Sequence, residues 1–282
     1  MGYPCRFIPR NVFDLATITS TVTPYTTTPL VNLKNDRRAR VCRWPSAATI
    51  SLKGTWNGQG FQVGGVALDR FNLEPAATVR FRGFSAADWT GSTLVDTGTV
   101  APYNAAALGS FTWGVDPLGA GVFDGYLGQK YWNAWFAKQT ILSFQFDIID
   151  TGNSWNYIEI GRAVLGDYIE TGYNAVFGIE AGWNTKTTQD ETDGGSIFSD
   201  GRLPRRAITG SLECLTETER RDMYDFTRYV EKRKVFLASF QAGEAGSMER
   251  DYTIPCAKFT DLPKIPWKAP TAHSMRFAIV EG

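Results

Sequence analysis

Histidine is almost absent from this chain of 282 residues, which contains a single one, His273. Hydrolytic triads and histidine metal centres need this side chain as a base or a ligand. His273 stands in the run Ala-His-Ser-Met-Arg-Phe-Ala-Ile-Val, which has the pattern of a terminal strand, so we expect a structural role for it. The sequence therefore predicts no catalytic residues, and the protein is not expected to be an enzyme.

Cysteine is scarce as well, and no C-x-x-C pair occurs. The chain has four cysteines, Cys5, Cys42, Cys214 and Cys256, which are far apart in the sequence. This spacing gives no support to a zinc or iron–sulfur centre, so we expect no metal site and no cofactor. In a reducing compartment the four thiols are expected to be buried and to behave as small hydrophobic groups.

Net charge and long apolar runs are also missing. Lys and Arg number 29 against 29 Asp and Glu, so neither nucleic acid nor a membrane is an expected partner. No stretch approaches the roughly 20 apolar residues that a membrane helix needs. The N-terminal run Met-Gly-Tyr-Pro-Cys-Arg lacks a secretory pattern, so folding in a cytoplasm is expected. The expected partner is therefore a protein or a neutral ligand.

What the sequence does contain is a series of short strand patterns, which predicts a mainly β fold of two β-sandwich or jelly-roll-like domains. The run 141–150 is the most apolar and is expected to be a central strand. The first domain should close near Gly166. Strands are expected at 48–52, 61–68, 77–84, 93–100, 157–160, 174–181, 205–213, 235–240, 251–256 and 274–280.

The first thirty residues are predicted to form an extended N-terminal arm. Thr17 to Thr28 is rich in threonine and contains Pro24, which favours an extended arm or an edge strand over a helix. Such an arm can add a strand to a neighbour's sheet. Deletion of residues 1–30 is then expected to leave a folded chain that no longer assembles. The basic segment 32–44 is read as a solvated loop or as a contact with an acidic neighbour.

Four aromatic side chains gather in the run Tyr131-Trp132-Asn133-Ala134-Trp135-Phe136. Aromatic rings of this kind can fill a core, form a subunit interface or stack on a sugar ring. The sequence leaves these three alternatives open. Tyr131, Trp132, Trp135 and Phe136 are the candidate interface or glycan-stacking residues.

One helix is expected near 216–233. Thr216 and Glu219 have the Thr-x-x-Glu spacing of a capping box. Met223, Phe226 and Val230 form one apolar stripe, which predicts that the helix covers a sheet.

The segment Asn184 to Ser199, which comes before the strand expected at 205–213, is predicted to be a polar loop. Its Asp190-Glu191-Thr192-Asp193-Gly194-Gly195 run has residue types that suit calcium. The EF-hand spacing is absent, however, which favours a solvated loop.

Several dispersed segments resemble structural proteins of tailed-bacteriophage tail tips, namely minor tail, distal tail or baseplate proteins with a discoidin-like (galactose-binding-like) jelly roll. The segments that carry the resemblance are Leu33 to Ser46, Val66 to Phe81, Asp96-Thr97-Gly98, Tyr157 to Arg162, Arg205-Arg206 and Val235 to Phe240.

The resemblance implies a structural component of a virion tail tip, assembled in the host cytoplasm. Its partners would be other tail or baseplate proteins and further copies in a homo-oligomeric ring. The implied division is an arm at 1–30, a discoidin-like domain at 31–167, and a second β-rich domain with the helix at 168–282.

Two other functions are weighed against this one. A carbohydrate-binding module recognising a host surface glycan would stack sugars on Trp89, Trp113, Trp132 or Trp135. A glycoside hydrolase needs two neighbouring carboxyl groups. The available carboxyl groups are Asp147, Asp150, Glu159 and Glu170, for which the sequence indicates no pairing.

Overall fold

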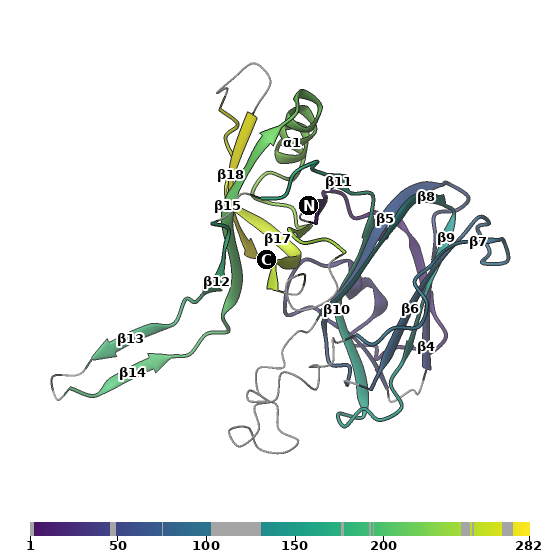
Figure 1. Cartoon of the computed structure of the whole chain (residues 1–282). Coiled ribbons are helices and arrows are strands. Elements are labelled where there is room, and N and C mark those ends of the chain that lie inside the picture. The colour runs from purple at the N-terminus through teal and green to yellow at the C-terminus, as the bar shows by residue number, and fades with distance from the viewer. Residues whose placement is uncertain are drawn as a thin grey trace, which may run out of the picture. The chain divides into compact units, whose positions relative to one another are not determined.

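The fold is described by a computed structural model, shown in Figure 1. It describes residues 3–45, 49–74, 76–102, 131–175, 178–191, 193, 195–243, 249, 251–266 and 273–282. The chain divides into two compact units. Unit 1 comprises Met1–Pro9, Ile169–Glu244 and Asp251–Gly282, and unit 2 comprises Arg10–Tyr168 and Ala245–Arg250. The predicted mainly β fold with one covering helix is confirmed.

Unit 2 contains two antiparallel sheets. One has the order β3-β10-β5-β8 and the other the order β2-β4-β9-β6-β7. The first is built from β3 (Cys42–Pro45), β10 (Tyr157–Gly166), β5 (Phe61–Phe71) and β8 (Tyr131–Ile141). The second is built from β2 (Thr17–Ser20), β4 (Thr49–Thr55), β9 (Ser143–Ile149), β6 (Thr78–Phe84) and β7 (Thr93–Asp96).

The core of unit 2 follows from the period-two patterns of these strands. Phe144, Phe146 and Ile148 alternate along β9 and are fully buried. Because β9 pairs with β4 on one side and β6 on the other, the prediction of a central strand here is confirmed. Trp44 on β3 and Phe81 on β6 belong to the same apolar cluster.

Residues 3–30 differ from the predicted arm, because their apolar side chains are part of the two units. Phe7 in β1 (Arg6–Ile8) and Phe13 in the 3₁₀ helix η1 (Val12–Leu15) are both buried. The strand β2 pairs with β4 and is the edge of its sheet, which is the edge-strand alternative for Thr17 onward. Deletion of residues 1–30 would therefore remove core side chains and cannot serve as a test of assembly alone.

The basic segment that follows is also folded into unit 2. It contains the 3₁₀ helix η2 (Leu30–Lys34) and β3. The buried guanidinium of Arg162 holds this region, donating to both carboxylate oxygens of Asp14 at 2.5 and 2.7 Å and to the Leu33 carbonyl at 3.0 Å. Asp36 lies 2.9 Å from the same guanidinium. The segment thus supplies the acidic group Asp36 to a buried arginine of its own unit, and its Arg43 pairs with Glu159 of the same unit. A contact of its other basic side chains with an acidic neighbour stays a prediction.

Unit 1 is organised on one seven-stranded antiparallel sheet. Its order is β11-β1-β16-β17-β18-β15-β12. The further strands are β11 (Ile169–Glu170), β16 (Phe236–Ser239), β17 (Thr253–Asp261), β18 (His273–Glu281), β15 (Arg205–Leu215) and β12 (Glu180–Asn184). His273 is buried at the start of β18, in agreement with the strand expected there.

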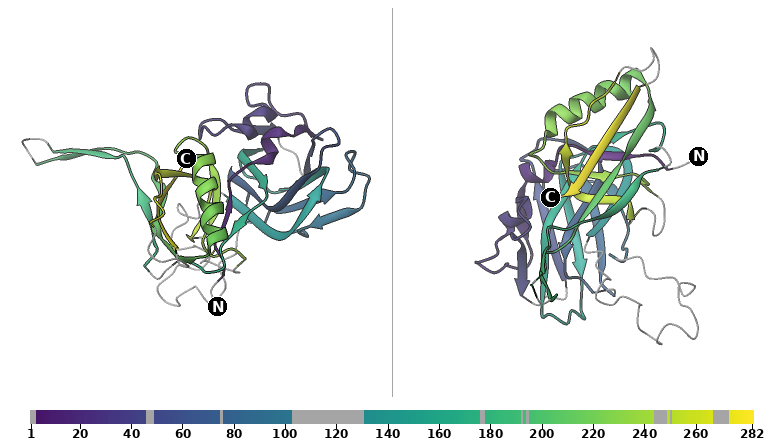
Figure 2. Two further views of the ribbon diagram at one scale, coloured as in Figure 1. Left: turned by 90° about the horizontal axis from the view of Figure 1, so that it is seen from above. Right: turned by 90° about the vertical axis from the view of Figure 1, so that its left-hand side faces the viewer.

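The helix α1 (Glu217–Val230) lies against this sheet, as both views of Figure 2 show. Its predicted capping box is confirmed: the Thr216 hydroxyl accepts from the Glu219 N–H at 3.3 Å, and the Glu219 carboxylate accepts from the Thr216 N–H at 2.7 Å. Met223, Phe226 and Val230 are buried in the core of unit 1. No helix in the described residues is long and apolar enough to cross a membrane.

Unit 2 is an insertion into unit 1. The chain leaves unit 1 after β1 and returns to it at β11, and these two strands pair, with Arg6 opposite Glu170. Their side chains form an ion pair at 2.6 Å. Because entry and exit lie on adjacent strands, the insertion leaves the sheet of unit 1 unbroken.

The cysteine prediction holds for three of the four thiols. Cys5, Cys42 and Cys256 are buried, whereas Cys214 is exposed. Cys214 lies at a register shift in β15 and has a positive φ of 58°, so the strand turns its side chain away from the core. Burial raises the pKa of Cys5 to about 11 and that of Cys42 to about 12.

Candidate functional site

A two-stranded ribbon extends from the sheet of unit 1 (Figure 1). It begins with β12 paired to β15 and continues as β13 (Thr188–Glu191) paired to β14 (Ile197–Asp200). The polar loop predicted for Asn184 to Ser199 is therefore wrong. Thr188, Ile197 and Phe198 favour strands. Asp190 and Glu191 end β13, and of the acidic run only Asp193 among the described acidic residues lies in the turn.

The gap between the two ladders is bridged by threonine. The Thr187 hydroxyl accepts from the Arg202 N–H at 3.1 Å, joining the two chains of the ribbon where no strand is assigned. Thr185 and Thr187 are joined by a further hydrogen bond of 2.7 Å between their hydroxyls. The ribbon thus holds its shape by hydrogen bonds and without a core of its own.

Large apolar side chains are exposed along the ribbon. The exposed fractions are 57% for Trp183, 65% for both Ile197 and Phe198, and 82% for Leu203. Phe198 lies opposite Asp190, and Ile197 lies opposite Glu191 on the other face. A two-stranded ribbon is marginally stable by itself, and exposed apolar groups of this size are typical of surfaces that a partner covers. The ribbon is our first candidate functional site.

The aromatic cluster predicted from the sequence divides between the two faces of β8. Trp132 is buried, and Phe136 stacks on Phe81 with ring centroids 5.7 Å apart, so both contribute to the core of unit 2. Tyr131 is buried as well. Of the three roles left open by the sequence, these rings therefore fill the core. Because Tyr131 and Trp132 are buried, neither has an open face on which a sugar could stack.

Trp135 is half-buried and lies among polar groups. Its indole N–H donates to Glu249 Oε1 at 2.9 Å, and Asn133 donates to the same oxygen at 2.8 Å. The ring of Tyr168 meets it edge-on, with centroids 5.8 Å apart. The interface or stacking role of Trp135 stays a prediction.

Of the other stacking candidates, Trp89 is hydrogen-bonded to the backbone carbonyls of Gly54 and Phe144, at 3.3 and 3.2 Å. Trp113 lies outside the described residues. The structure adds Trp155, which the sequence reading did not consider. Its side chain is 62% exposed, and its ring contacts that of Tyr157, with centroids 6.4 Å apart.

Trp155 stands on a loop held by side-chain hydrogen bonds. Asn153 donates to Asp150 Oδ2 at 2.8 Å and to the Asn72 carbonyl at 3.2 Å, and its own Oδ1 accepts from the Trp155 N–H at 2.9 Å. Ser154 donates to Glu74 at 2.7 Å. This loop presents an exposed aromatic ring on fixed backbone, with polar groups beside it.

Three of the four carboxyl groups considered for hydrolysis each pair with a different arginine, and the fourth, Asp150, accepts from Asn153 at 2.8 Å. Asp147 accepts from Arg82 at 2.5 Å, whereas Glu159, on the other sheet of unit 2, pairs with Arg43. Glu170 belongs to unit 1 and pairs with Arg6. Each of these three carboxylates is thus engaged by an arginine of its own.

No group of three or more His, Cys, Asp or Glu side chains suited to a metal ion occurs in the described part of the chain. Of the run considered for calcium, Asp190, Glu191 and Asp193 are described and exposed. The absence of a metal site stays a prediction for the whole chain.

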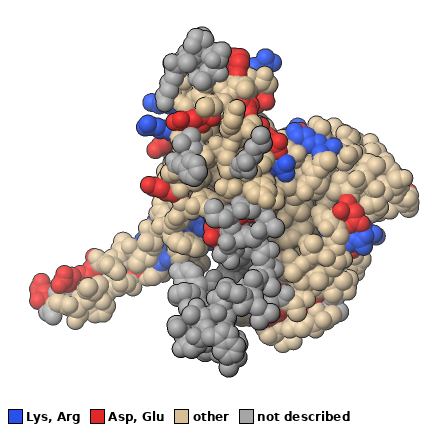
Figure 3. Space-filling view, viewed as in Figure 1, with Lys and Arg blue, Asp and Glu red and all other residues tan. Residues whose placement is uncertain are grey.

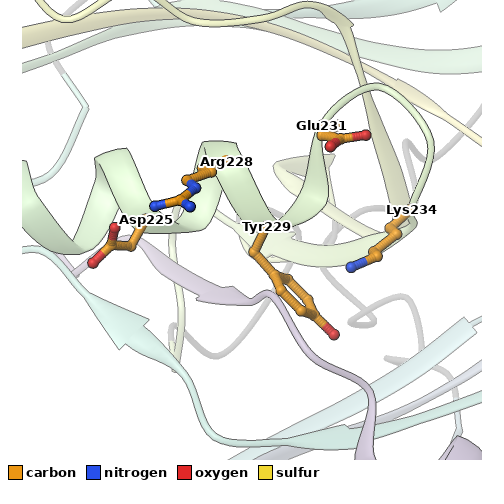
Figure 4. A pocket seen from close by; sticks show the side chains of 5 residues that line it. All are labelled: Asp225, Arg228, Tyr229, Glu231 and Lys234. Carbon is orange, nitrogen blue, oxygen red and sulfur yellow. The ribbon is translucent and has the colours of Figure 1, made fainter.

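A shallow depression lies at the end of α1 (Figure 4). It is lined by Asp225, Arg228, Tyr229, Glu231 and Lys234. The Lys234 ammonium lies 3.5 Å from the centroid of the Tyr229 ring. Four of the five lining side chains are charged, which differs from the mostly apolar walls of small-molecule sites. We assign no ligand to it.

No protein-family model matches this sequence, and no curated protein matches it. Among solved structures, the chain is similar to a Ruminococcus gnavus GH29 fucosidase in complex with fucose. The TM-score is 0.38 with 8% identity, and the match covers 57% of this chain and 27% of the fucosidase. The chain thus spans 27% of the length of that enzyme.

Two further similar structures are carbohydrate-binding modules. A Streptococcus pneumoniae fucose binding module matches with a TM-score of 0.38 and 7% identity, over 56% of this chain and 94% of the module. Chitosan-binding module 1 from a Paenibacillus sp. IK-5 chitosanase/glucanase matches with a TM-score of 0.38 and 9% identity, over 55% of this chain and 98% of the module. None of the three is a phage protein, and likeness at this level assigns no ligand to this chain.

Proposed function

We propose that this protein is a structural subunit that assembles through its ribbon with further copies of itself and with neighbouring proteins. The supporting observation is the exposure of Trp183, Ile197, Phe198 and Leu203 on a ribbon that has no core. The place of assembly is a virion tail tip, as the sequence resemblance implies. Solved structures lend no support to this location, which rests on the sequence alone.

The two faces of the ribbon explain why a partner is needed. Ile197 and Phe198 are adjacent in β14 and point to opposite faces. Burying both side chains would require both faces of the ribbon to be covered, whereas β12, β13 and β14 are exposed throughout. A partner that covers the ribbon removes apolar surface from water, at about 25 cal/mol per Å².

The first test is the mass of the full-length protein in solution, measured by sedimentation velocity. We expect the wild type to form an oligomer, and we expect the double variant Ile197→Ser with Phe198→Ser to sediment as a monomer with an unchanged melting temperature. Tyr224→Ser on α1 is the matched control, because Tyr224 is 57% exposed and lies outside the ribbon. An oligomer that persists in the double variant contradicts the proposal.

The location is tested by immunogold electron microscopy on particles from the source lysate. Gold at the tail tip supports a virion component. If the particles carry no gold although a control epitope on them is labelled, the location is contradicted. Assembly through the ribbon is then tested by the mass measurement alone.

Carbohydrate binding by unit 2 is the second candidate function, and the exposed ring of Trp155 favours it. Aromatic rings stack on the apolar face of a pyranose, and fixed polar groups beside the ring bind its hydroxyls. Glu74 and Asn153 lie in the hydrogen-bonded network that holds this loop. A loop already ordered in the free protein loses little conformational entropy on binding.

A glycan array tests this second function. We expect binding of the wild type and its loss in Trp155→Ala, while Trp183→Ala retains it. Trp183 is a suitable control because its exposed fraction of 57% is close to that of Trp155 and because it belongs to unit 1. Equal binding by both variants excludes Trp155 as the stacking ring.

A further inference from the structure

The ribbon separates its charges along its length. Three acidic side chains, Asp190, Glu191 and Asp193, lie at its free end, which we call the tip. Lys and Arg are absent from residues 187–201. Basic side chains lie where the ribbon joins the sheet, which we call the root, formed by Lys186, Arg202, Arg205 and Arg206. Figure 3 shows acidic groups at the free end and basic groups nearer the sheet.

The charges at the tip and part of those at the root are open to a partner. Asp190, Glu191, Lys186 and Arg205 are exposed, and none of the four forms an ion pair with another described residue. The rest of the root is engaged within the chain. Arg202 donates to Asp200 at 2.8 Å, and Arg206 is half-buried and donates to the Thr253 carbonyl at 2.9 Å.

The tip and root of one ribbon do not neutralise each other. Arg205 lies opposite Asn184, which precedes Asp190 by six positions. At about 3.3 Å per strand residue the two charged groups are roughly 20 Å apart. This is more than twice the screening length of about 8 Å at physiological salt. Lys186 precedes Asp190 by four positions, which places it roughly 13 Å away, about one and a half screening lengths. Each ribbon therefore presents a negative end and a positive end.

We propose that the acidic tip of one copy contacts the basic root of the ribbon on a second copy. The inference rests on the proposed assembly through the ribbon and names the partner surface. A second copy fits because it carries the complementary charge at the root, and because contact along the ribbon also covers Ile197 and Phe198. The charges set the direction of the contact, since like ends repel.

Charge reversal tests the contact on the full-length protein. In the tip variant Asp190 and Glu191 are both replaced by Lys, and in the root variant Lys186 and Arg205 are both replaced by Glu. Each variant alone presents ends of one sign, so we expect association to weaken by about tenfold or more relative to wild type. Replacing Asp222 and Asp225 on α1 by Lys is the control for the tip variant, because it makes the same change in net charge away from the ribbon.

Mixing the two variants gives the decisive measurement. The tip of each variant is then complementary to the root of the other, so the mixture is expected to regain the wild-type association constant. Sedimentation velocity in low salt, roughly 0.05 M, and in high salt, roughly 0.5 M, should show wild-type association falling as the charges are screened.

The outcomes separate this inference from the proposed function. If Ile197→Ser with Phe198→Ser abolishes assembly but both charge variants associate as the wild type does, the tip-to-root contact is overturned and assembly through the ribbon stands. If the wild type is monomeric, both fail. If each charge variant loses association and the mixture does not regain it, the tip-to-root contact is also overturned, because the two ends then do not meet.

Discussion

At the scale of single residues, backbone conformation decides which side chains are accessible. Cys214 has a positive φ of 58° at the register shift of β15, and its thiol is exposed, while the other three thiols are buried. Burial also raises the pKa of Cys5 and of Cys42, so their thiolate forms are depleted at pH 8.

We therefore expect one thiol of the four to react quickly with a disulfide reagent in the native protein at pH 8. All four should react after unfolding in denaturant, because burial and the raised pKa values are then lost. The number of chromophore molecules released per protein chain measures the reactive thiols in the native and in the unfolded protein. Cys214→Ser should remove the fast phase, and a fast phase that survives this change would contradict the assignment.

Glu231 has a strained backbone conformation, which lowers the stability of the folded protein. It follows the last residue of α1 with φ 54° and ψ −148°, a region that glycine occupies without strain and other residues rarely enter. We expect Glu231→Gly to raise the free energy of unfolding by about 1 kcal/mol, since relief of strain exceeds the entropy that glycine adds to the unfolded chain.

Chemical denaturation measures this change. Glu231→Ala is the control, because alanine removes the charge and keeps the strain. An equal gain in both variants would assign the effect to the charge and not to the backbone.

At the scale of elements, the capping box of α1 is a local sequence motif that the folded protein forms as its spacing predicts. The hydrogen bonds between Thr216 and Glu219 satisfy backbone N–H groups that the first turn leaves free. We expect Thr216→Ala to lower the free energy of unfolding by about 1 kcal/mol.

Thr218→Ala is the matched control for this prediction. Thr218 lies exposed in the first turn of α1, two residues beyond the cap, and alanine favours a helix there. Thermal unfolding of both variants checks the expectation. A loss of the same size in Thr218→Ala would show that the cap is not the cause.

The ribbon is the element for which the sequence reading failed. Its acidic and glycine residues resemble those of a solvated loop, and its apolar residues Ile197 and Phe198 are adjacent, so no alternation of buried positions marks a strand. Pairing of Glu191 with Ile197 and of Thr188 with Asp200 depends on the return of the chain, which local composition does not specify.

At the scale of the whole molecule, two separate apolar clusters stabilise the chain. One lies in unit 2 and contains Phe144, and the other lies in unit 1 and contains Phe226. No residue belongs to both clusters among those described. Each unit therefore has a core that can unfold by its own transition.

Differential scanning calorimetry is expected to resolve two transitions. Phe144→Ala should lower one of them by roughly 10 °C and leave the other in place, because a buried phenylalanine contributes about 3 to 5 kcal/mol. Phe226→Ala should do the reverse. A single transition that both variants lower equally would show that the units unfold together.

Strand periodicity was sufficient to predict the mainly β fold, the central position of β9 and the amphipathic helix. These features depend on side chains close in sequence, such as Phe144 and Phe146 on one face of β9 or Met223 and Phe226 on one face of α1. Solvent exclusion acts on them directly, so their pattern is visible in the chain itself.

Tertiary structure decided what local patterns could not. Phe7 joins the core of unit 1 and Phe13 that of unit 2, although only five residues lie between them, because β1 pairs with β16 and η1 packs in the inserted unit. Trp155 is exposed and Trp132 is buried, although both are tryptophans among strand residues. Which aromatic ring faces solvent, and which segment becomes the ribbon, depends on long-range pairing, whose free energy comes from residues far apart in the chain.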